Sequence, residues 1–360
     1  MQSGEDVTVV YTPGHGLVAD TLIMHGVVRA LAHMGIYDAW VERVGERYRI
    51  EFVGKPRKLV DTDIGEALLR SAKLYLVEGV LTGPLRKIND TNPNISAFRS
   101  WVSDLAEAVS EADLLEFTPD HRERRREGRS RSKALITLHI SLSSVYGKYH
   151  PRDFSVTEGV QYSVCGTCFA FANVGLAYGA AALVAREGSD LDAVLMSVAP
   201  VDRVSAVDLL VMQRLTEGYT VLRGRGAPLL AAPMYWLSTG ETLYAVDAEL
   251  DLVVWRVAKS GNFIRSLDVV SIPVDNLMKF VAEVKRRVRA WPRVVERLMQ
   301  QAPEALARLT EFVIYGGDLY GVVRELATLR CNEGQRRGEE LCIGEAASII
   351  ADVLVDLKTW

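Results

Sequence analysis

The sequence predicts an α+β protein, with a mixed α/β body that contains several short antiparallel strands and a C-terminal helical section after it. Helix-like and strand-like apolar patterns alternate as far as Pro273, and only helix-like patterns follow it. Hydrophobic residues make up 49% of the 360 residues, which is enough to bury a sizeable core. We therefore expect two regions, residues 1–273 and residues 274–360.

The body is expected to begin with a strand and a helix. Residues 7–11 are rich in β-branched side chains, Pro13 and Gly14 interrupt them, and residues 17–34 are strongly apolar. Alternating apolar side chains predict a second strand at residues 48–53. The next expected elements are a helix running into a strand at 63–80, a loop at 89–94, a helix at 96–116 and a strand at 134–143.

The middle of the chain is predicted to continue the mixed pattern. The apolar residues 165–186 read as one buried helix, followed by a strand at 193–198 and a helix at 206–215. Turn residues then separate four short apolar runs that we expect to be strands. These runs are residues 229–237, 242–246, 252–257 and 264–271. The helical section is expected to break at Pro292, Pro303, Gly316–Gly317 and the loop 331–344.

Composition limits the classes of function. The formal net charge of −4 means that any nucleic-acid surface must be a segregated basic patch. No N-terminal run has the zones of a signal peptide, and no apolar stretch reaches membrane-spanning length, so we expect a soluble cytoplasmic protein without a membrane partner. The chain has only seven Asn and six Gln, which favours a thermophilic source.

The clearest functional signal is the arginine-dense segment, residues 121–133. It carries six arginines and one lysine against two glutamates, a density that repels itself until a polyanion neutralises it. Arginine's planar fork suits phosphate oxygens and guanine edges, so we predict nucleic-acid binding here. The alternatives are a solvated surface loop or a loop that docks on an acidic neighbour. The candidate residues are Arg122, Arg124, Arg125, Arg126, Arg129, Arg131 and Lys133.

Two further segments are candidates for the same surface. Tyr146, Lys148, Tyr149 and Arg152 interleave aromatic rings with cations, which allows base stacking beside backbone contacts. A turn with its tyrosines packed on the core explains this pattern equally well. The pair Arg223 and Arg225 alternates with glycines that permit close backbone approach, and a simple β-turn accounts for it as well.

A run of arginines also marks the helical section. The spacing of Arg286, Arg289, Arg293 and Arg297 is near-helical and describes a basic stripe, although Pro292 interrupts the register. We favour a solvated helix face over a binding stripe here.

Cys165-Gly-Thr-Cys168 has three interpretations. A redox pair at a helix N-terminus would have a low thiol pKa, but such a motif usually stands near the start of a compact fold. A structural zinc site would need Cys331 and Cys342 as further ligands, across a spacing unlike a second short knuckle. The interpretation that we favour is buried cysteines, or a Cys331–Cys342 disulfide; no other cofactor is expected. The order of His121, Glu123 and paired cysteines matches the zinc deaminases poorly, because His121 lies in the arginine-dense segment.

Three segments together resemble one family. They are the opening Pro13-Gly-His-Gly-Leu-Val-Ala-Asp20, the stretch Gly147-Lys-Tyr-His-Pro-Arg-Asp-Phe-Ser155, and the helix that starts with the Cys165–Cys168 motif. In this order they are similar to the large subunit of archaeal type I-A CRISPR interference complexes, the Cascade-like assemblies of antiviral defence. The resemblance covers most of the chain.

The resemblance implies a non-catalytic subunit that binds nucleic acid within a guide-RNA–protein complex. Its implied partners are the CRISPR guide RNA, target double-stranded DNA, the backbone, handle-binding and small subunits, and a helicase-nuclease. Its implied tasks are recognition of the protospacer-adjacent motif, duplex opening and contact with the displaced strand. Asn92 and Asn94, in a predicted loop, are candidates for base-edge contact. The rival hypothesis is an enzyme centred on Cys165 and Cys168, either a dithiol oxidoreductase or a metal-dependent enzyme that modifies nucleic acid.

Overall fold

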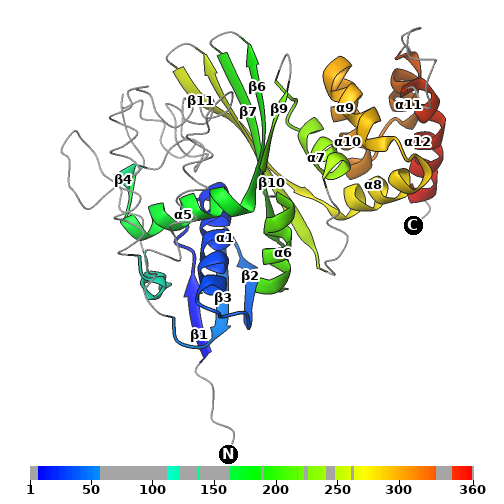
Figure 1. The fold of residues 1–360 in the computed structure, drawn as a ribbon. Helices are drawn as coiled ribbons and strands as arrows, with labels where there is room; N and C mark the ends of the chain where they lie inside the picture. Colours follow the sequence, from blue (N-terminus) through cyan, green and yellow to red (C-terminus); the bar gives the residue numbers. More distant parts are fainter. Residues whose placement is uncertain are drawn as a thin grey trace, which may run out of the picture.

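A computed structural model describes residues 7–56, 112–119, 121, 136–137, 163–187, 190–216, 218–222, 226–240, 248–260, 263–329 and 343–358. These residues form a mixed α/β body followed by helices, which confirms the predicted α+β class (Figure 1). One hydrophobic core runs through the body and continues under the helices. The elements predicted at residues 63–80 and 89–94 lie outside the described residues.

A four-stranded sheet holds the beginning of the chain. Its order is β1 (Val7–Tyr11), β3 (Arg47–Val53), β2 (Ala39–Val44) and β8 (Val204–Ser205), and each neighbouring pair is antiparallel. Along β3 every second side chain is buried, among them Tyr48, Ile50 and Phe52, as the alternating sequence predicts. The strands expected at 7–11 and 48–53 are confirmed, and β2 is an addition that we did not expect.

A five-stranded sheet forms the centre of the molecule. Its order is β11 (Phe263–Pro273), β10 (Leu250–Ser260), β7 (Asp190–Pro200), β6 (Ala180–Glu187) and β9 (Gly218–Leu222). All neighbours are antiparallel except β6 and β9, which are parallel. The predicted strands 193–198, 252–257 and 264–271 lie inside β7, β10 and β11, and all three strands are longer than expected.

Two helices cross in close contact beside these sheets. Helix α1 (Leu17–His33) contacts β3 of the small sheet and β7 and β10 of the large one, and it crosses α5 (Gly166–Gly179) (Figure 1). A Cβ atom on Gly175 would lie 1.7 Å from the carbonyl oxygen of Leu22, and one on Gly26 would lie 2.1 Å from that of Phe171. Glycine is therefore required at both positions for the backbones to come this close.

The predicted helix 165–186 is wrong in its second half. Helix α5 ends at Gly179, where a Cβ would meet the ring of His25 at 2.4 Å, and strand β6 begins at Ala180. Because β6 lies between β7 and β9 and its residues 180–185 are all buried, its sequence shows no alternation. A short, fully buried strand and a buried helix have the same apolar pattern.

The predicted strand 229–237 is also wrong, because this segment forms helix α7 (Ala231–Thr239). Its residues 231–238 include no β-branched side chain, and Pro233 lies in the first turn, where its missing N–H leaves no helical bond unmade. The Lys285 ammonium donates to the carbonyls of Leu237 and Gly240 at the end of α7. Helix α7 thus packs with the C-terminal helices. The run 242–246 lies outside the described residues.

The shorter elements of the body complete it. Helix α6 (Ala206–Thr216) confirms the helix expected at 206–215. Strands β4 (Ile136–Thr137) and β5 (Ser163–Val164) form a two-stranded sheet, so only two residues of the predicted strand 134–143 are described. The end of the predicted helix 96–116 is a single 3₁₀ turn, η1 (Leu114–Glu116), and residues 96–111 are not described.

The helical section follows β11, as predicted. It consists of α8 (Asp275–Arg287), α9 (Trp291–Gln301), α10 (Pro303–Tyr315), α11 (Leu319–Thr328) and α12 (Ile343–Lys358). Pro292 and Pro303 lie in the first turns of α9 and α10, and Gly316 and Gly317 end α10 with positive φ angles of 77° and 130°. The expected breaks at these positions are confirmed.

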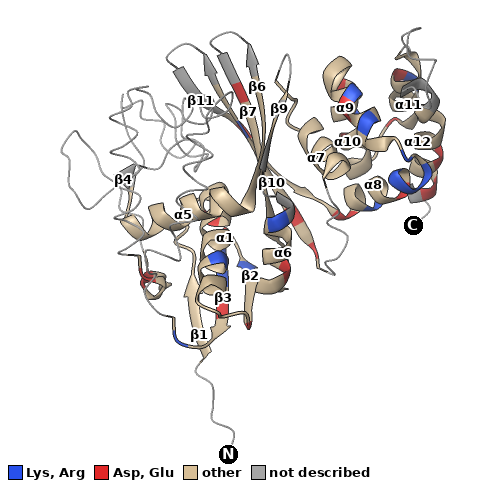
Figure 2. Ribbon diagram, in the orientation of Figure 1, with Lys and Arg blue, Asp and Glu red and all other residues tan. Residues whose placement is uncertain are grey.

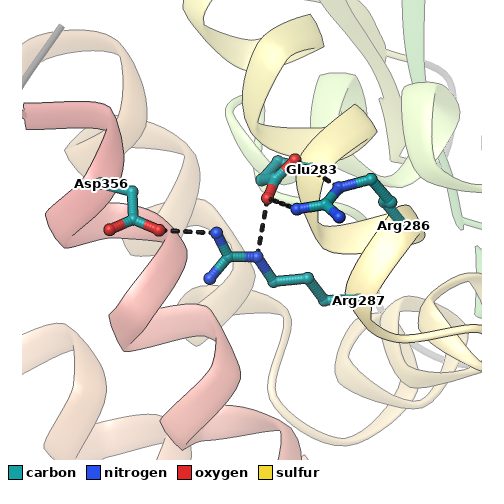
Figure 3. A network of polar contacts seen from close by, with 4 residues as sticks. All are labelled: Glu283, Arg286, Arg287 and Asp356. Atoms are coloured by element: carbon teal, nitrogen blue, oxygen red, sulfur yellow. Dashed lines mark hydrogen bonds and ion pairs between the residues drawn. The ribbon is translucent and has the colours of Figure 1, made fainter.

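Charged side chains join α8 to α12. Glu283 accepts hydrogen bonds from Arg286 and Arg287, and Arg287 also donates to Asp356 of α12 (Figure 3). These hydrogen bonds lower the pKa of the Glu283 carboxyl to about 2. None of the helices in the described ranges has both the length and the apolar composition that crossing a membrane requires.

Candidate functional site

The first turn of α5 (Gly166–Gly179) places the side chains of Cys165 and Cys168 next to each other. Cys165 is the N-cap residue, with extended backbone angles of −68° and 165°, and its Sγ accepts a hydrogen bond from the backbone N–H of Cys168 at 3.5 Å. Cys168 is fully buried, whereas Cys165 is partly exposed. The two Sγ atoms lie 3.4 Å apart, well beyond the bond length of about 2.05 Å in a disulfide, so both thiols are free.

His121 completes a three-residue cluster with these cysteines. Its Nε2 atom lies 3.1 Å from Cys168 Sγ and 3.4 Å from Cys165 Sγ. Its Nδ1 atom lies 2.8 Å from the carbonyl oxygen of Glu116, which can only accept, so Nδ1 carries a hydrogen. Nε2 is therefore the ring atom that faces the sulfurs. The donor atoms of His121, Cys165 and Cys168 all lie within 4.8 Å of one another, as metal ligands would.

The electrostatics separate the two thiols. Hydrogen bonding from Cys168, and then from His121, holds the pKa of the Cys165 thiol at about 4. Burial, helped by the neighbouring Cys165, raises the pKa of Cys168 well above its ordinary value. The hydrogen bond to Cys165 raises the pKa of His121 in turn. Near neutral pH, a Cys165 thiolate therefore stands at the positive end of the α5 dipole beside the imidazole.

Two further titratable groups approach this cluster, His15 from the turn before α1 and Asp20 from the first turn of that helix. Asp20 is buried and accepts a hydrogen bond from the backbone N–H of Gly14 at 2.8 Å, and burial raises the pKa of its carboxyl to about 6. Burial, followed by the charge of His121, lowers the pKa of His15 to about 3. The turn that positions them depends on Gly14 and Gly16, which have positive φ angles of 91° and 100°.

The short segment that carries His121 is fixed from three sides. The backbone N–H of Tyr11 donates to the carbonyl of Phe117 at 2.8 Å, and the Arg47 guanidinium donates to the carbonyl of Pro119 at 3.1 Å. From α5, the Thr167 hydroxyl donates to the Glu116 carboxylate at 2.8 Å. The aromatic ring of Phe117 packs between His121 and Phe171. The arginine-dense segment 121–133 consequently starts from a residue held in place.

The structure does not describe the basic, aromatic and amide side chains that are predicted to bind nucleic acid. All of these residues lie outside the described parts of the chain: Asn92, Asn94, Arg122, Arg124, Arg125, Arg126, Arg129, Arg131, Lys133, Tyr146, Lys148, Tyr149, Arg152, Arg223 and Arg225. Cys331 and Cys342 also lie outside them. Those assignments stay predictions, and of the four cysteines predicted as metal ligands only Cys165 and Cys168 are described.

Gly226, which ends the Arg-Gly-Arg-Gly motif, has a structural reason for being glycine. A Cβ on it would lie 1.8 Å from the carboxylate oxygen Oδ2 of Asp192. Asp192 of β7 in turn accepts hydrogen bonds from Arg256 of β10. This glycine therefore permits close approach to an ion pair within the sheet.

The arginines of the helical section do not form one uniform stripe. Arg286 donates to Glu283, and Arg286, Arg289 and Arg293 are exposed while Arg297 is half-buried. Arg289 lies between α8 and α9, and Figure 2 shows both basic and acidic residues on these two helices. A solvated face with both charge signs, the interpretation that the sequence favours, agrees with this arrangement.

The sequence identifies Cys165 and Cys168 as candidate ligands, but it does not identify His121 as their partner. The sequence places His121 in the arginine-dense segment, 44 residues before Cys165, and for that reason its order with the cysteines matches a zinc deaminase poorly. The structure closes that gap, since the segment holding His121 packs directly on the N-terminus of α5. His15, before α1, and Asp20, in its first turn, likewise have no sequence spacing that links them to the cysteines, and the fold brings both close enough to interact electrostatically with the cluster.

Comparison with known proteins places the chain in a family. Residues 8–341 match the family model of a CRISPR-associated protein, Cas_Csa4. The chain is also 34% identical to the CRISPR system associated protein Cas8 of Thermoproteus tenax. That similarity spans 349 residues, which are 91% of this chain and 95% of the relative.

Proposed function

The chain belongs to the Cas_Csa4 family of CRISPR-associated proteins as a Cas8-type large subunit, and from that premise we propose that it binds target DNA within an RNA-guided interference complex. In such complexes base pairing with the guide reads the sequence, and protein contacts read a short flanking motif and hold the opened strands. The tasks that we assign to this subunit are recognition of the protospacer-adjacent motif, help in opening the duplex and contact with the displaced strand. No catalytic step is assigned to it.

Family membership is the observation that carries the proposal, and the distribution of charge supports it. The chain has a net charge of −4, yet one segment of 13 residues contains six arginines. DNA binding is dominated by such local clusters, because each neutralised phosphate releases condensed counterions. His121 supports the assignment too, since it fixes the start of this segment against α5. We assign backbone contacts to Arg122, Arg124, Arg125, Arg126, Arg129, Arg131, Lys133, Lys148 and Arg152.

The remaining candidates have different chemistry. We assign base stacking to Tyr146 and Tyr149, because aromatic rings accept any base face. Asn92 and Asn94 are proposed for base edges, because an amide offers both a donor and an acceptor. Arg223 and Arg225 are proposed for further phosphate contacts. The proposed partners are the guide RNA, the target duplex, the other Cascade-type subunits and the helicase-nuclease.

The deciding experiment is charge reversal of Arg124, Arg125 and Arg126 together, in the assembled complex with guide RNA. We expect weaker binding of the target duplex and a slope of log K against log salt that is shallower by about 3, since each phosphate contact contributes about 0.9. Reversal of Arg289, Arg293 and Arg324 is the matched control, because these exposed arginines of the helical section change the net charge equally. An unchanged slope in the first variant would refute the assignment.

The rival function is an enzyme centred on Cys165 and Cys168. A low thiol pKa at Cys165 beside a buried Cys168 is the arrangement that a dithiol oxidoreductase uses, and a His-Cys-Cys cluster suits a metal-dependent enzyme. The family match gives this rival no support. Replacing both cysteines by serine separates the two functions. Loss of thermal stability with unchanged guide-dependent DNA binding indicates a structural role, and loss of a measurable turnover with an intact fold indicates an enzyme.

A further inference from the structure

The geometry points to a zinc site formed by His121 Nε2, Cys165 Sγ and Cys168 Sγ, which we propose fixes the start of the arginine-dense segment to helix α5. This inference is independent of DNA binding, because it concerns the ligands and the metal alone. It also differs from the four-cysteine zinc site that the sequence offers as an alternative to buried cysteines, since a histidine is one of the ligands.

The distances between the three ligand atoms fit a small tetrahedral ion. Zinc binds thiolate sulfur at about 2.3 Å and imidazole nitrogen at about 2.0–2.1 Å, so the edges of a tetrahedral site measure about 3.8 Å between sulfurs and about 3.5 Å between sulfur and nitrogen. The cluster has a sulfur–sulfur distance of 3.4 Å and sulfur–nitrogen distances of 3.1 and 3.4 Å. The ligand atoms need to move apart by only a few tenths of an ångström to admit the ion.

The surroundings of His121 match those of a metal ligand. Its Nδ1 donates a hydrogen bond to the carbonyl oxygen of Glu116 at 2.8 Å, so Nε2, which faces the sulfurs, is the ring nitrogen available to bind the ion. Metal-binding histidines are usually oriented in this way by a carbonyl or carboxylate on the other ring nitrogen. Glu116 is itself fixed, because the Thr167 hydroxyl of α5 donates to its carboxylate at 2.8 Å.

The cysteine side of the site is equally well placed. Cys165 and Cys168 occupy the N-cap and third positions of α5, so the rigid first turn sets the direction of both sulfurs. The helix N-terminus carries a partial positive charge that favours thiolates, the form that binds zinc. The described residues supply three ligands, and a water molecule would complete the tetrahedron at the partly exposed side of Cys165.

The proposed ligands come from distant parts of the sequence. His121 and Cys165 are 44 residues apart, and the residues between them include the arginine-dense segment. A bound ion would link two points of the chain that lie 44 residues apart, which restricts the unfolded chain in the way that a cross-link does. It would also hold His121, the first residue of the arginine-dense segment, against α5.

The test uses the full-length protein, purified without chelator, and measures zinc by elemental analysis and thermal unfolding with and without added zinc. We expect one zinc ion per chain in the wild type and a lower Tm after the ion is removed. Cobalt in place of zinc should produce the visible bands of a tetrahedral ion and a thiolate-to-cobalt charge-transfer band. His121→Ala and Cys165→Ser should each lower zinc affinity by more than the roughly 10- to 100-fold typical of losing an outer partner of a ligand.

The matched control is the double variant Cys331→Ser/Cys342→Ser, which removes the same number of thiols from outside the cluster. It should keep the ion. Zinc that is retained by His121→Ala and lost by this control would assign the ion to a four-cysteine site and overturn the proposal. Wild-type protein that holds no zinc, shows no cobalt bands and has a Tm that zinc leaves unchanged would overturn it as well. Since Cys168 is buried, His121→Ala is the variant that keeps the core intact. Either result leaves the salt-slope test of DNA binding unaffected.

Discussion

At the crossing of α1 and α5 two helix backbones touch through glycines, whereas α8 and α12 are joined by arginine–carboxylate pairs at their surface. In the first region Gly26 and Gly175 leave no space for even a methyl group. In the second, Arg287 reaches both Glu283 and Asp356 through a long side chain (Figure 3). Both regions bury apolar helix faces in the same hydrophobic core.

The difference shows where each region can absorb a change. Backbone atoms cannot relieve a clash by a side-chain rotation. An added methyl group must therefore push the two helices apart and displace the side chains packed against them. Long charged side chains reorient at little cost, and water replaces a lost partner. We therefore expect the α1–α5 crossing to be much more sensitive to substitution than the surface of the helical section.

The largest effect is expected for Gly175→Ala in α5. The new Cβ would lie 1.7 Å from the Leu22 carbonyl oxygen, so the substitution should lower the free energy of unfolding by about 4 kcal/mol, at the upper end for single changes. Chemical denaturation measures this loss. Gly321→Ala in α11 is the control, because its Cβ meets only the flexible Asp318 side chain, and a change within about 1 kcal/mol is expected. Equal losses for the two variants would contradict the comparison.

The second effect concerns His25, which is buried in α1 beside the crossing. Its Nε2 donates to the carbonyl of Val198 at 2.6 Å and its Nδ1 accepts from Gln213 at 3.2 Å, and burial lowers the pKa of the ring from 6.5 to about 4. The unfolded chain therefore binds a proton at a higher pH than the folded protein does. Stability contributed by the neutral ring is complete above about pH 6.5 and declines as the pH falls toward 4.

Across that pH window the loss should reach about 3 kcal/mol, or about 1.4 kcal/mol for each pH unit. His25→Gln removes the titrating group. It should reduce the slope of the free energy of unfolding against pH by the contribution of one proton, about 1.4 kcal/mol per pH unit. Denaturant titrations at several pH values between 4 and 7 measure both slopes. A variant with the same slope as the wild type would show that His25 does not titrate in this way.

A smaller effect is expected for Arg256→Gln in the large sheet. Arg256 of β10 pairs with Asp192 of β7, whose side chain is only 18% exposed, so losing the cation leaves a poorly solvated carboxylate. We expect a loss of about 1–2 kcal/mol, allowing for partial solvent screening. Denaturation at low and high salt measures it, and most of the loss should persist in high salt because the pair is sheltered.

The smallest effect is expected for Arg287→Gln at the α8–α12 contact. The loss in the free energy of unfolding should be smaller than that caused by Arg256→Gln. About 1 M salt should abolish it, because at that salt concentration exposed charges are screened within a few ångströms. The Glu283 carboxylate, whose pKa is lowered to about 2, contributes stability above pH 4.5 that is lost as the pH falls toward 2. A loss in high salt as large as that of Arg256→Gln would break the comparison.

The sequence predicts an element well where its apolar pattern is distinctive. The alternation in β3 follows directly from a strand with one buried side. Helix α1 is buried on nearly all sides, and the length of its apolar run identifies it; both elements are where they were expected. Strand β6 was read as helix because it is buried on both faces, so nothing alternates. Helix α7 is predicted as a strand although its residues 231–238 include no β-branched side chain, and it packs on helices far along the chain.

The candidate site was predictable only in part for a related reason. The Cys165–Cys168 pair is visible because both ligands lie within one turn of a helix. His121 is 44 residues before Cys165, and the packing of the segment around Glu116 and Phe117 against α5 brings it to the sulfurs. A run of arginines around it also gave the histidine another plausible role. Contacts between distant segments leave no spacing to recognise.

The glycine contact between α1 and α5 also has a use in comparing distant sequences. Any relative that keeps this crossing must keep the smallest side chains at the positions of Gly26 and Gly175, and at Gly179 beside the His25 ring. Basic loops can diverge freely, since phosphates accept cations from many positions. A glycine in an apolar helix near the N-terminus, paired with a Gly-x-x-x-Gly helix after a Cys-x-x-Cys motif, is therefore a lasting signature by which divergent members can be identified.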